Sequence, residues 1–209
     1  MPELGLLRFF PARARYRTLI ASVLCLACAT VLAAQDVGVD DPTARMEAVS
    51  TAVRARDPKA AVAMVAGYQD EKSPAVRAAL VRGVAVLDPV RGGVLAQTAS
   101  SDLQPSVRLA AAEALAKSQG TASVPALVAA LNAETNAGVR HTIIFWLGTF
   151  KTAAARAALA QALGTDSDPN VRLQAARSLQ RHGTKAARAA LAAGKNDSDS
   201  RVRSIADEP

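Results

Sequence analysis

Residues 166–179, DSDPNVRLQAARSL, read as the start and the buried face of one helix. Asp168 can accept a hydrogen bond from a free N–H at a helix N-terminus, and Pro169 suits the first helical position, where a missing N–H costs nothing. Apolar residues then recur at the spacing of one helical face, at Ala175, Ala176 and Leu179. The stretch therefore predicts an amphipathic helix.

The same phrase returns along the chain at a fixed interval. The pair Val-Arg recurs every 31 or 32 residues, and its arginines are Arg77, Arg108, Arg140, Arg172 and Arg203. A degenerate copy, Ala44-Arg45, stands 32 residues before the first. Copies in register at one period indicate a repeat protein, in which each unit stacks on its neighbours.

The surroundings of each arginine predict a helical hairpin. Four positions before it stand residues mostly suited to a helix N-cap, namely Asp41, Ser73, Gln104, Asn136, Asp168 and Asp199. Three, four and seven positions after it stand apolar residues, namely Leu80, Val81 and Val84; Ala111, Ala112 and Leu115; Ile143, Ile144 and Leu147; Ala175, Ala176 and Leu179. A second helix is predicted before each phrase, over residues 58–67, 89–99, 124–132, 153–164 and 185–194. Stacked hairpins of about 31 residues would share one continuous core.

The phrase DPxVRxxAAxxL, as written at residues 168–179, resembles the short HEAT repeats of bacterial proteins, the type also found in phycobilin lyase subunits. The resemblance covers roughly residues 40–205. It implies an all-α fold, a right-handed α-solenoid (alpha-alpha superhelix) of about five to six HEAT-like helical hairpins. HEAT arrays serve as scaffolds, adaptors, nucleic-acid binders and occasional enzymes, so the resemblance implies a fold more than a function.

Composition agrees with a helical repeat. Half of the 209 residues are hydrophobic, enough for one domain with a continuous core. Aromatic residues are few, whereas alanine and leucine are abundant, which favours closely packed helices over a β-sandwich. The formal net charge of +7 suggests nucleic acid or an acidic surface as a partner.

The N-terminal segment weakens that interpretation of the charge. Four arginines precede an uncharged stretch, residues 18–35, which ends in small residues, as secretory signal peptides do. We expect residues 1–34 to be a signal peptide, cleaved after Ala29, Ala33 or Ala34, or an uncleaved membrane anchor, and residues 35–209 to be the HEAT-like repeat domain. Removal of residues 1–34 leaves 21 basic and 17 acidic residues and no cysteine. The expected location is the periplasm or the outside of a bacterial cell, or the inner membrane with the repeats outside the cytoplasm.

An acidic residue stands six positions before the arginine in five copies. These residues are Glu71, Asp102, Glu134, Asp166 and Asp197. One interpretation is a row of carboxylates that binds cations. We favour a structural ladder, because these residues recur with the repeat: each carboxylate would accept hydrogen bonds from a guanidinium or from helix N-terminal amides and tie one turn to the next. The resemblance to HEAT repeats independently implies such a ladder, with Arg77, Arg108, Arg140, Arg172 and Arg203.

Few residues could support catalysis. His141 falls at a position that is otherwise mostly apolar, so we expect a packed ring, and His182 precedes Gly183 at a helix end, where it can interact with the helix dipole. The sequence has no glycine-rich phosphate loop, nucleophile motif or His-Glu pair, and the resemblance implies that an iron-binding HEAT enzyme would use such pairs. We therefore expect no catalytic residues, no metal and no cofactor, and a protein that is not an enzyme.

Positions that differ between copies are candidates for binding, because a solenoid leaves its binding face free to vary. The fifth position after the arginine is polar in every copy but one, and so should face solvent; it holds Ser50, Arg82, Glu113, Phe145 and Arg177. Phe145 is followed by Trp146, and this pair either belongs to a wider core or forms an exposed interface anchor. The candidate partner-binding residues are Phe145, Trp146, Arg82, Glu113 and Arg177.

The sixth copy stops at VRSIADEP, residues 202–209, which forms either a polar cap supplied by Asp207 and Glu208 or an open apolar edge that a partner completes. We predict an exported, monomeric scaffold or adaptor that binds a protein or peptide on its concave face, and that meets the membrane only through an uncleaved N-terminal segment. One alternative is a nucleic-acid-binding HEAT-like protein, which Glu113 and the modest mature charge disfavour. Another is an accessory subunit of an enzyme that loads or matures a cofactor.

Overall fold

The computed structural model describes residues 41–207, which are almost entirely helical. The predicted signal peptide or anchor, residues 1–34, lies outside the described residues, as does Glu208 of the proposed cap. No helix between residues 41 and 207 combines the length and the apolar character that crossing a bilayer requires.

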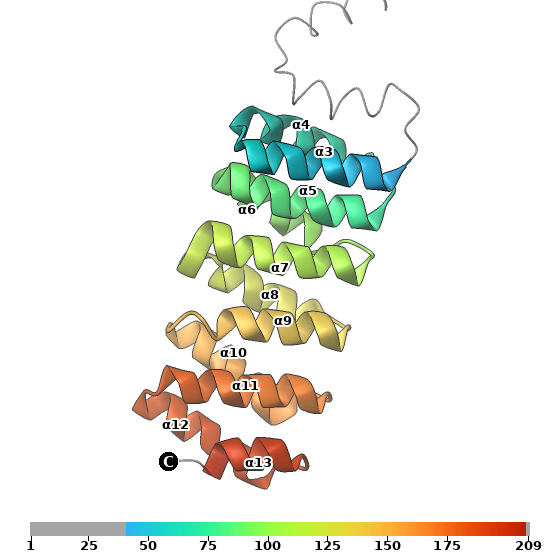
Figure 1. The fold of residues 1–209 in the computed structure, drawn as a ribbon. Helices are drawn as coiled ribbons and strands as arrows, with labels where there is room; N and C mark the ends of the chain where they lie inside the picture. Colours follow the sequence, from blue (N-terminus) through green and yellow to red (C-terminus); the bar gives the residue numbers. More distant parts are fainter. Residues whose placement is uncertain (1–40, 208–209) are drawn as a thin grey trace, which may run out of the picture.

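The helices form two rows, and we call one of them the arginine row because it carries every repeated arginine (Figure 1). Its members are α3 (Pro42–Ala55), α5 (Pro74–Leu87), α7 (Pro105–Gln119), α9 (Ala137–Leu147), α11 (Pro169–His182) and α13 (Ser200–Asp207). Each of these helices packs directly on the next one in the row. The row is therefore one continuous layer from the first copy to the last.

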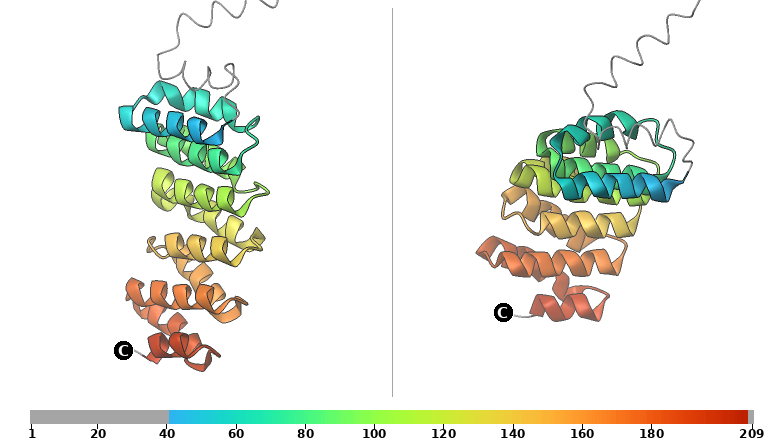
Figure 2. Two further views of the ribbon diagram at one scale, coloured as in Figure 1. Left: turned by 45° about the vertical axis from the view of Figure 1, so that its right-hand side comes forward. Right: turned by 45° about the horizontal axis from the view of Figure 1, so that its top comes forward.

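The second row lies behind the arginine row, and Figure 2 shows the two layers from two further sides. It consists of α4 (Pro58–Tyr68), α6 (Pro89–Ala99), α8 (Val124–Ala133), α10 (Ala153–Thr165) and α12 (Lys185–Leu191), with 3-10 turns at Gly120–Ser123 and Ala192–Asn196. These helices pack mainly against the arginine row and little against one another. The predicted all-α solenoid is confirmed.

Most helix starts follow the predicted chemistry. Proline opens α3, α5, α7 and α11, and the side chains of Asp41, Asn136, Asp168 and Asp199 accept hydrogen bonds from first-turn amides. Ser73 and Gln104 occupy N-cap positions without a side-chain cap. Their own amides are instead bound by acidic side chains two residues earlier, Glu71 and Asp102.

One core runs between the two rows. The apolar residues predicted three, four and seven positions after the arginine in α5, α7, α9 and α11 are all buried. Each helix of the second row contributes at least one large buried residue, among them Met64, Leu95, Leu127, Leu159 and Leu191. Since each hairpin covers only part of this core, stability comes from stacking.

Candidate functional site

A ladder of ion pairs connects successive copies. Five of the six repeated arginines bind the carboxylate that begins the next copy, in the pairs Arg45–Glu71, Arg77–Asp102, Arg108–Glu134, Arg140–Asp166 and Arg172–Asp197. In every pair Nε and Nη2 donate to the two carboxylate oxygens, at 2.6 to 3.1 Å. Such two-pronged geometry is both strong and directional.

Ladder residues also bind the backbone of their own copy. Nη1 of Arg172 donates to the backbone carbonyl of Asp166 at 2.9 Å, and the Asp166 carboxylate accepts the amide of Asp168 at 2.9 Å. Burial raises the pKa of the Asp166 carboxyl, but the hydrogen bonds from Arg140 and from the Asp168 amide outweigh it and hold the pKa below its usual value. The carboxylate is therefore charged at neutral pH.

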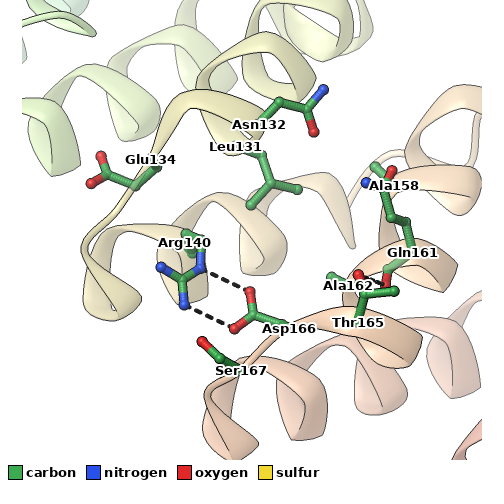
Figure 3. A pocket seen from close by; sticks show the side chains of 10 residues that line it. All are labelled: Leu131, Asn132, Glu134, Arg140, Ala158, Gln161, Ala162, Thr165, Asp166 and Ser167. Carbon is green, nitrogen blue, oxygen red and sulfur yellow. Dashed lines mark hydrogen bonds and ion pairs between the residues drawn. The ribbon is translucent and has the colours of Figure 1, made fainter.

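The carboxylates of the ladder are used for stacking and leave little for a cation. Figure 3 shows the Arg140–Asp166 pair among the residues that line a hollow, together with Leu131, Gln161 and Thr165. This hollow has a volume of about 310 Å³. Between residues 41 and 207, no group of three or more His, Cys, Asp or Glu side chains could hold a metal ion. The geometry favours the structural interpretation of these acids.

The ends of the ladder differ from the predicted set. Arg45, in the degenerate first copy, was not among the predicted ladder arginines, but it makes a full pair with the predicted ladder acid Glu71. Arg203 donates to the carbonyls of Asp197 and Ser198 at 2.6 and 3.0 Å but has no carboxylate partner within the part of the chain that the structure describes. Arg203 therefore lacks the bond to a following copy that its predicted place in the ladder implied.

One ladder pair has a third member that sequence reasoning missed. The hydroxyl of Tyr68 donates to the Asp102 carboxylate at 3.0 Å, and burial together with that carboxylate raises the pKa of Tyr68 to about 12. The signal was available: the position nine before the arginine is apolar or glycine in the four later copies, at Ala99, Leu131, Leu163 and Gly194.

A second chain of contacts crosses the exposed side of the arginine row. Arg82 on α5 donates to the Glu113 carboxylate on α7 at 2.9 Å, and Lys117, one turn further along α7, donates to the other oxygen at 2.6 Å. The Lys117 ammonium lies 5.7 Å from the centre of the Trp146 ring on α9. These contacts connect three consecutive copies.

The chain of contacts continues from α9 to α11. The rings of Phe145 and Trp146 meet edge to face, with centroids 5.3 Å apart and planes at 77°. The Arg181 guanidinium on α11 lies 5.8 Å from the centre of the Phe145 ring and donates to the Ser178 hydroxyl at 3.1 Å. We call this surface the variable face and define it as Arg82, Glu113, Lys117, Phe145, Trp146, Arg177 and Arg181.

The variable face includes the five predicted partner-binding residues. The exposure of its two aromatic rings decides between the two interpretations of that pair. Phe145 is exposed, with 39% of its surface accessible, whereas Trp146 is half-buried and packs against the core. Arg177 is exposed and has no hydrogen-bond or ion-pair partner among residues 41–207. Burial raises the pKa of Glu113, but Lys117 and Arg82 outweigh it and lower the pKa, so this residue carries its charge at neutral pH.

Two members of this face, Lys117 and Arg181, were missed from the sequence. Both occupy the ninth position after the arginine, whose residues are Arg54, Val86, Lys117, Thr149 and Arg181. The fifth and ninth positions lie four residues apart and so share one helical face. Extending the comparison of copies by one turn would have found them.

Neither histidine is a member of the variable face. His141 is half-buried. His182 is buried, and instead of serving the end of its own helix its Nε2 lies 3.2 Å from the carbonyl of Gly148, which ends α9. Its Nδ1 is buried without a partner, and burial lowers the pKa of the ring.

Comparison with protein-family models identifies the repeats. A model for HEAT repeats matches residues 124–208, and a model for the PBS lyase HEAT-like repeat matches residues 107–133. The chain is a HEAT-repeat protein. No curated protein matches this HEAT-repeat protein.

A solved structure of human deoxyhypusine hydroxylase in complex with glycerol is similar to this HEAT-repeat protein. The likeness covers 94% of the chain and 88% of the hydroxylase, at 22% sequence identity and a TM-score of 0.42. This similar protein is an enzyme, and the prediction that the chain is not an enzyme is withdrawn. At this identity the likeness assigns no reaction and no catalytic residue to the chain.

Proposed function

We propose that this HEAT-repeat protein is a helical scaffold that binds a partner protein through the variable face, with Phe145 as the central anchor. One observation carries the proposal. Phe145 occupies a position that is polar in the other copies, is exposed, and stands within a contact chain that spans four helices.

The chemistry of this face supports binding. Aromatic and arginine side chains dominate the energetics of protein interfaces, because they offer a large contact area and directional donors. Here they also hold one another in place, with Lys117 over Trp146 and Arg181 over Phe145. A face ordered before binding loses less side-chain entropy when the partner arrives.

Export is the second element of the proposal. The arginine-rich start and the uncharged run in residues 1–35 support it, and a mature chain without cysteine would fold equally well in an oxidising compartment. The same segment would account for membrane attachment if it were retained. Mass spectrometry of the N-terminus of protein recovered from the envelope fraction tests this element independently of partner binding.

Photo-crosslinking at position 145 tests the binding face. The photoreactive amino acid p-benzoylphenylalanine is placed at Phe145 in one variant and at Val90 in a control, because Val90 is 79% exposed but lies on α6 in the second row. After irradiation of native cells, we expect a discrete adduct from position 145 that is absent from position 90. The same adducts at both positions, or none at either, would contradict the proposal.

A further inference from the structure

We infer that the variable face binds an acidic segment of its partner, in which several Asp or Glu residues surround an apolar side chain that packs on Phe145. This inference rests on the proposed function and adds the chemistry of the partner. It is carried by an imbalance of charge along the stack, by the open arginines of α11, and by the geometry around the two aromatic rings.

Charge is distributed unevenly along the repeats. Residues 41–134 contain ten Lys or Arg and nine Asp or Glu, a net charge of +1, whereas residues 135–207 contain eleven and five, a net charge of +6. All five acids of the second stretch already have partners: Asp166 and Asp197 in the ladder, Asp168 and Asp199 at helix N-termini, and Asp207 with Lys195. The C-terminal half of the stack therefore attracts anions along its length.

The same imbalance appears on the variable face itself. At its α5–α7 end, Arg82 and Lys117 share the carboxylate of Glu113. At its α9–α11 end, neither Arg177 nor Arg181 has a carboxylate partner within residues 41–207. A guanidinium fork binds a carboxylate through two parallel hydrogen bonds, so these two arginines can each take an acidic side chain of a partner.

The position of Phe145 relative to these arginines fits a segment with an apolar residue among its acids. Arg82 and Glu113 hold the fifth position in neighbouring copies and touch at 2.9 Å; Phe145 and Arg177 hold the same position in the next two copies. The Arg181 guanidinium, on α11, also lies 5.8 Å from the centre of the Phe145 ring. An anchor on Phe145 would thus place flanking carboxylates within reach of both arginines.

The aromatic rings favour a peptide over a nucleic acid. Binding of single strands uses aromatic faces on which bases stack. Here Lys117 lies over the Trp146 ring and Arg181 over the Phe145 ring, so both rings already carry cations on a face.

A binding titration with a defined probe tests the inference. The probe is a fluorescein-labelled 14-residue peptide in which Glu and Asp alternate with Ser around two central leucines, titrated with the full chain and followed by fluorescence anisotropy. The test variant is R177E/R181E on α11, and the matched control is K185E/R188E on α12, which changes the same charge on exposed residues of the second row. Circular dichroism melts verify that both variants fold.

We expect micromolar binding to the wild type, a loss of at least tenfold in R177E/R181E and less than threefold in K185E/R188E. An equal loss in both variants would show diffuse attraction and overturn the inference. Absence of peptide binding by the wild type would overturn it too, as would tighter binding of a 20-nucleotide single strand that is lost in R177E/R181E, because the face would then recognise nucleic acid.

The crosslinking experiment separates the two proposals. If position 145 still yields its adduct in R177E/R181E while the peptide fails to bind, the partner is not recognised through acids and the proposed function stands. If position 145 yields no adduct in the wild type, the proposed function itself fails.

Discussion

Replacing Arg140 with methionine tests whether the ladder holds the stack together. The change keeps most of the aliphatic side chain and removes the bonds to Asp166 at 2.8 and 2.9 Å and the bond to the Thr135 carbonyl at 2.9 Å. The Asp166 side chain is only 8% exposed, so its charge would be left with the Asp168 amide as its remaining donor.

The size of the effect follows from that geometry. Breaking a buried ion pair by removing one partner costs about 3–5 kcal/mol. Arg140 is 14% exposed, and the remaining amide and entering water reduce the cost, so we expect the free energy of unfolding to fall by about 2–4 kcal/mol. For a domain of this size, that corresponds to a melting temperature lower by roughly 5–15 °C.

Urea denaturation followed by circular dichroism measures the change against two controls. Arg54→Met removes a pair with Glu47 whose side chains are 63% and 66% exposed, and should cost less than about 0.5 kcal/mol. The double variant R140M/D166N leaves no buried charge unpaired, so it should recover most of the loss. If R140M costs no more than R54M, or if adding D166N recovers nothing, the ladder does not stabilise the stack as argued.

Three further changes test the packing of α9 against α11 and one open position nearby. Gly148→Ala would place a Cβ 2.3 Å from the Ser178 hydroxyl, and so should lower the free energy of unfolding by about 1–3 kcal/mol in urea melts. Gly164→Ala meets nothing within 4 Å on α10 and should raise it by about 0.5–1 kcal/mol. His182 has a depressed pKa in the folded protein, so its contribution is present above its ordinary pKa of about 6.5 and is lost as pH falls through the folded value. Between pH 7 and pH 5 the melting temperature of the wild type should therefore fall further than that of His182→Gln. If the melting temperature of His182→Gln falls as far as that of the wild type, or if His141→Gln reduces the fall equally, the loss of stability does not come from His182.

The fold was predictable because the same sequence pattern recurs in six copies. A fixed period, N-caps and an apolar stripe at each copy leave few alternatives to stacked hairpins, and the structure has helices where the patterns indicated them. The acids of the ladder were also visible, because they recur in register with the arginines.

The direction of the ladder was not predictable from spacing. Asp166 lies 6 residues before Arg172 and 26 residues after Arg140, and both are within reach in a stack of hairpins. In the structure Arg140 binds the Asp166 carboxylate, whereas Arg172 binds the backbone carbonyl of Asp166. Only the packing of one copy on the next decides between these partners.

The candidate site was predictable in part for a similar reason. Variation at the fifth position pointed to Phe145, but a sequence does not report how much of a ring the neighbouring helix covers, and Trp146 lies half within the core. His182 shows the same limit, since its partner is the carbonyl of Gly148, 34 residues earlier and in another copy. Contacts between copies carry the information that a single copy lacks.

The ladder also bears on how a chain of this kind can change length. Every complete copy offers one carboxylate backwards and one guanidinium forwards, so copies are interchangeable at their junctions. A deletion of residues 109–140 would bring Arg108 to Asp166, in the place that Glu134 now fills, and a tandem duplication would insert a matched pair. Gene-level gain or loss of whole units would therefore lengthen or shorten the binding surface without stranding a charge at the new junction.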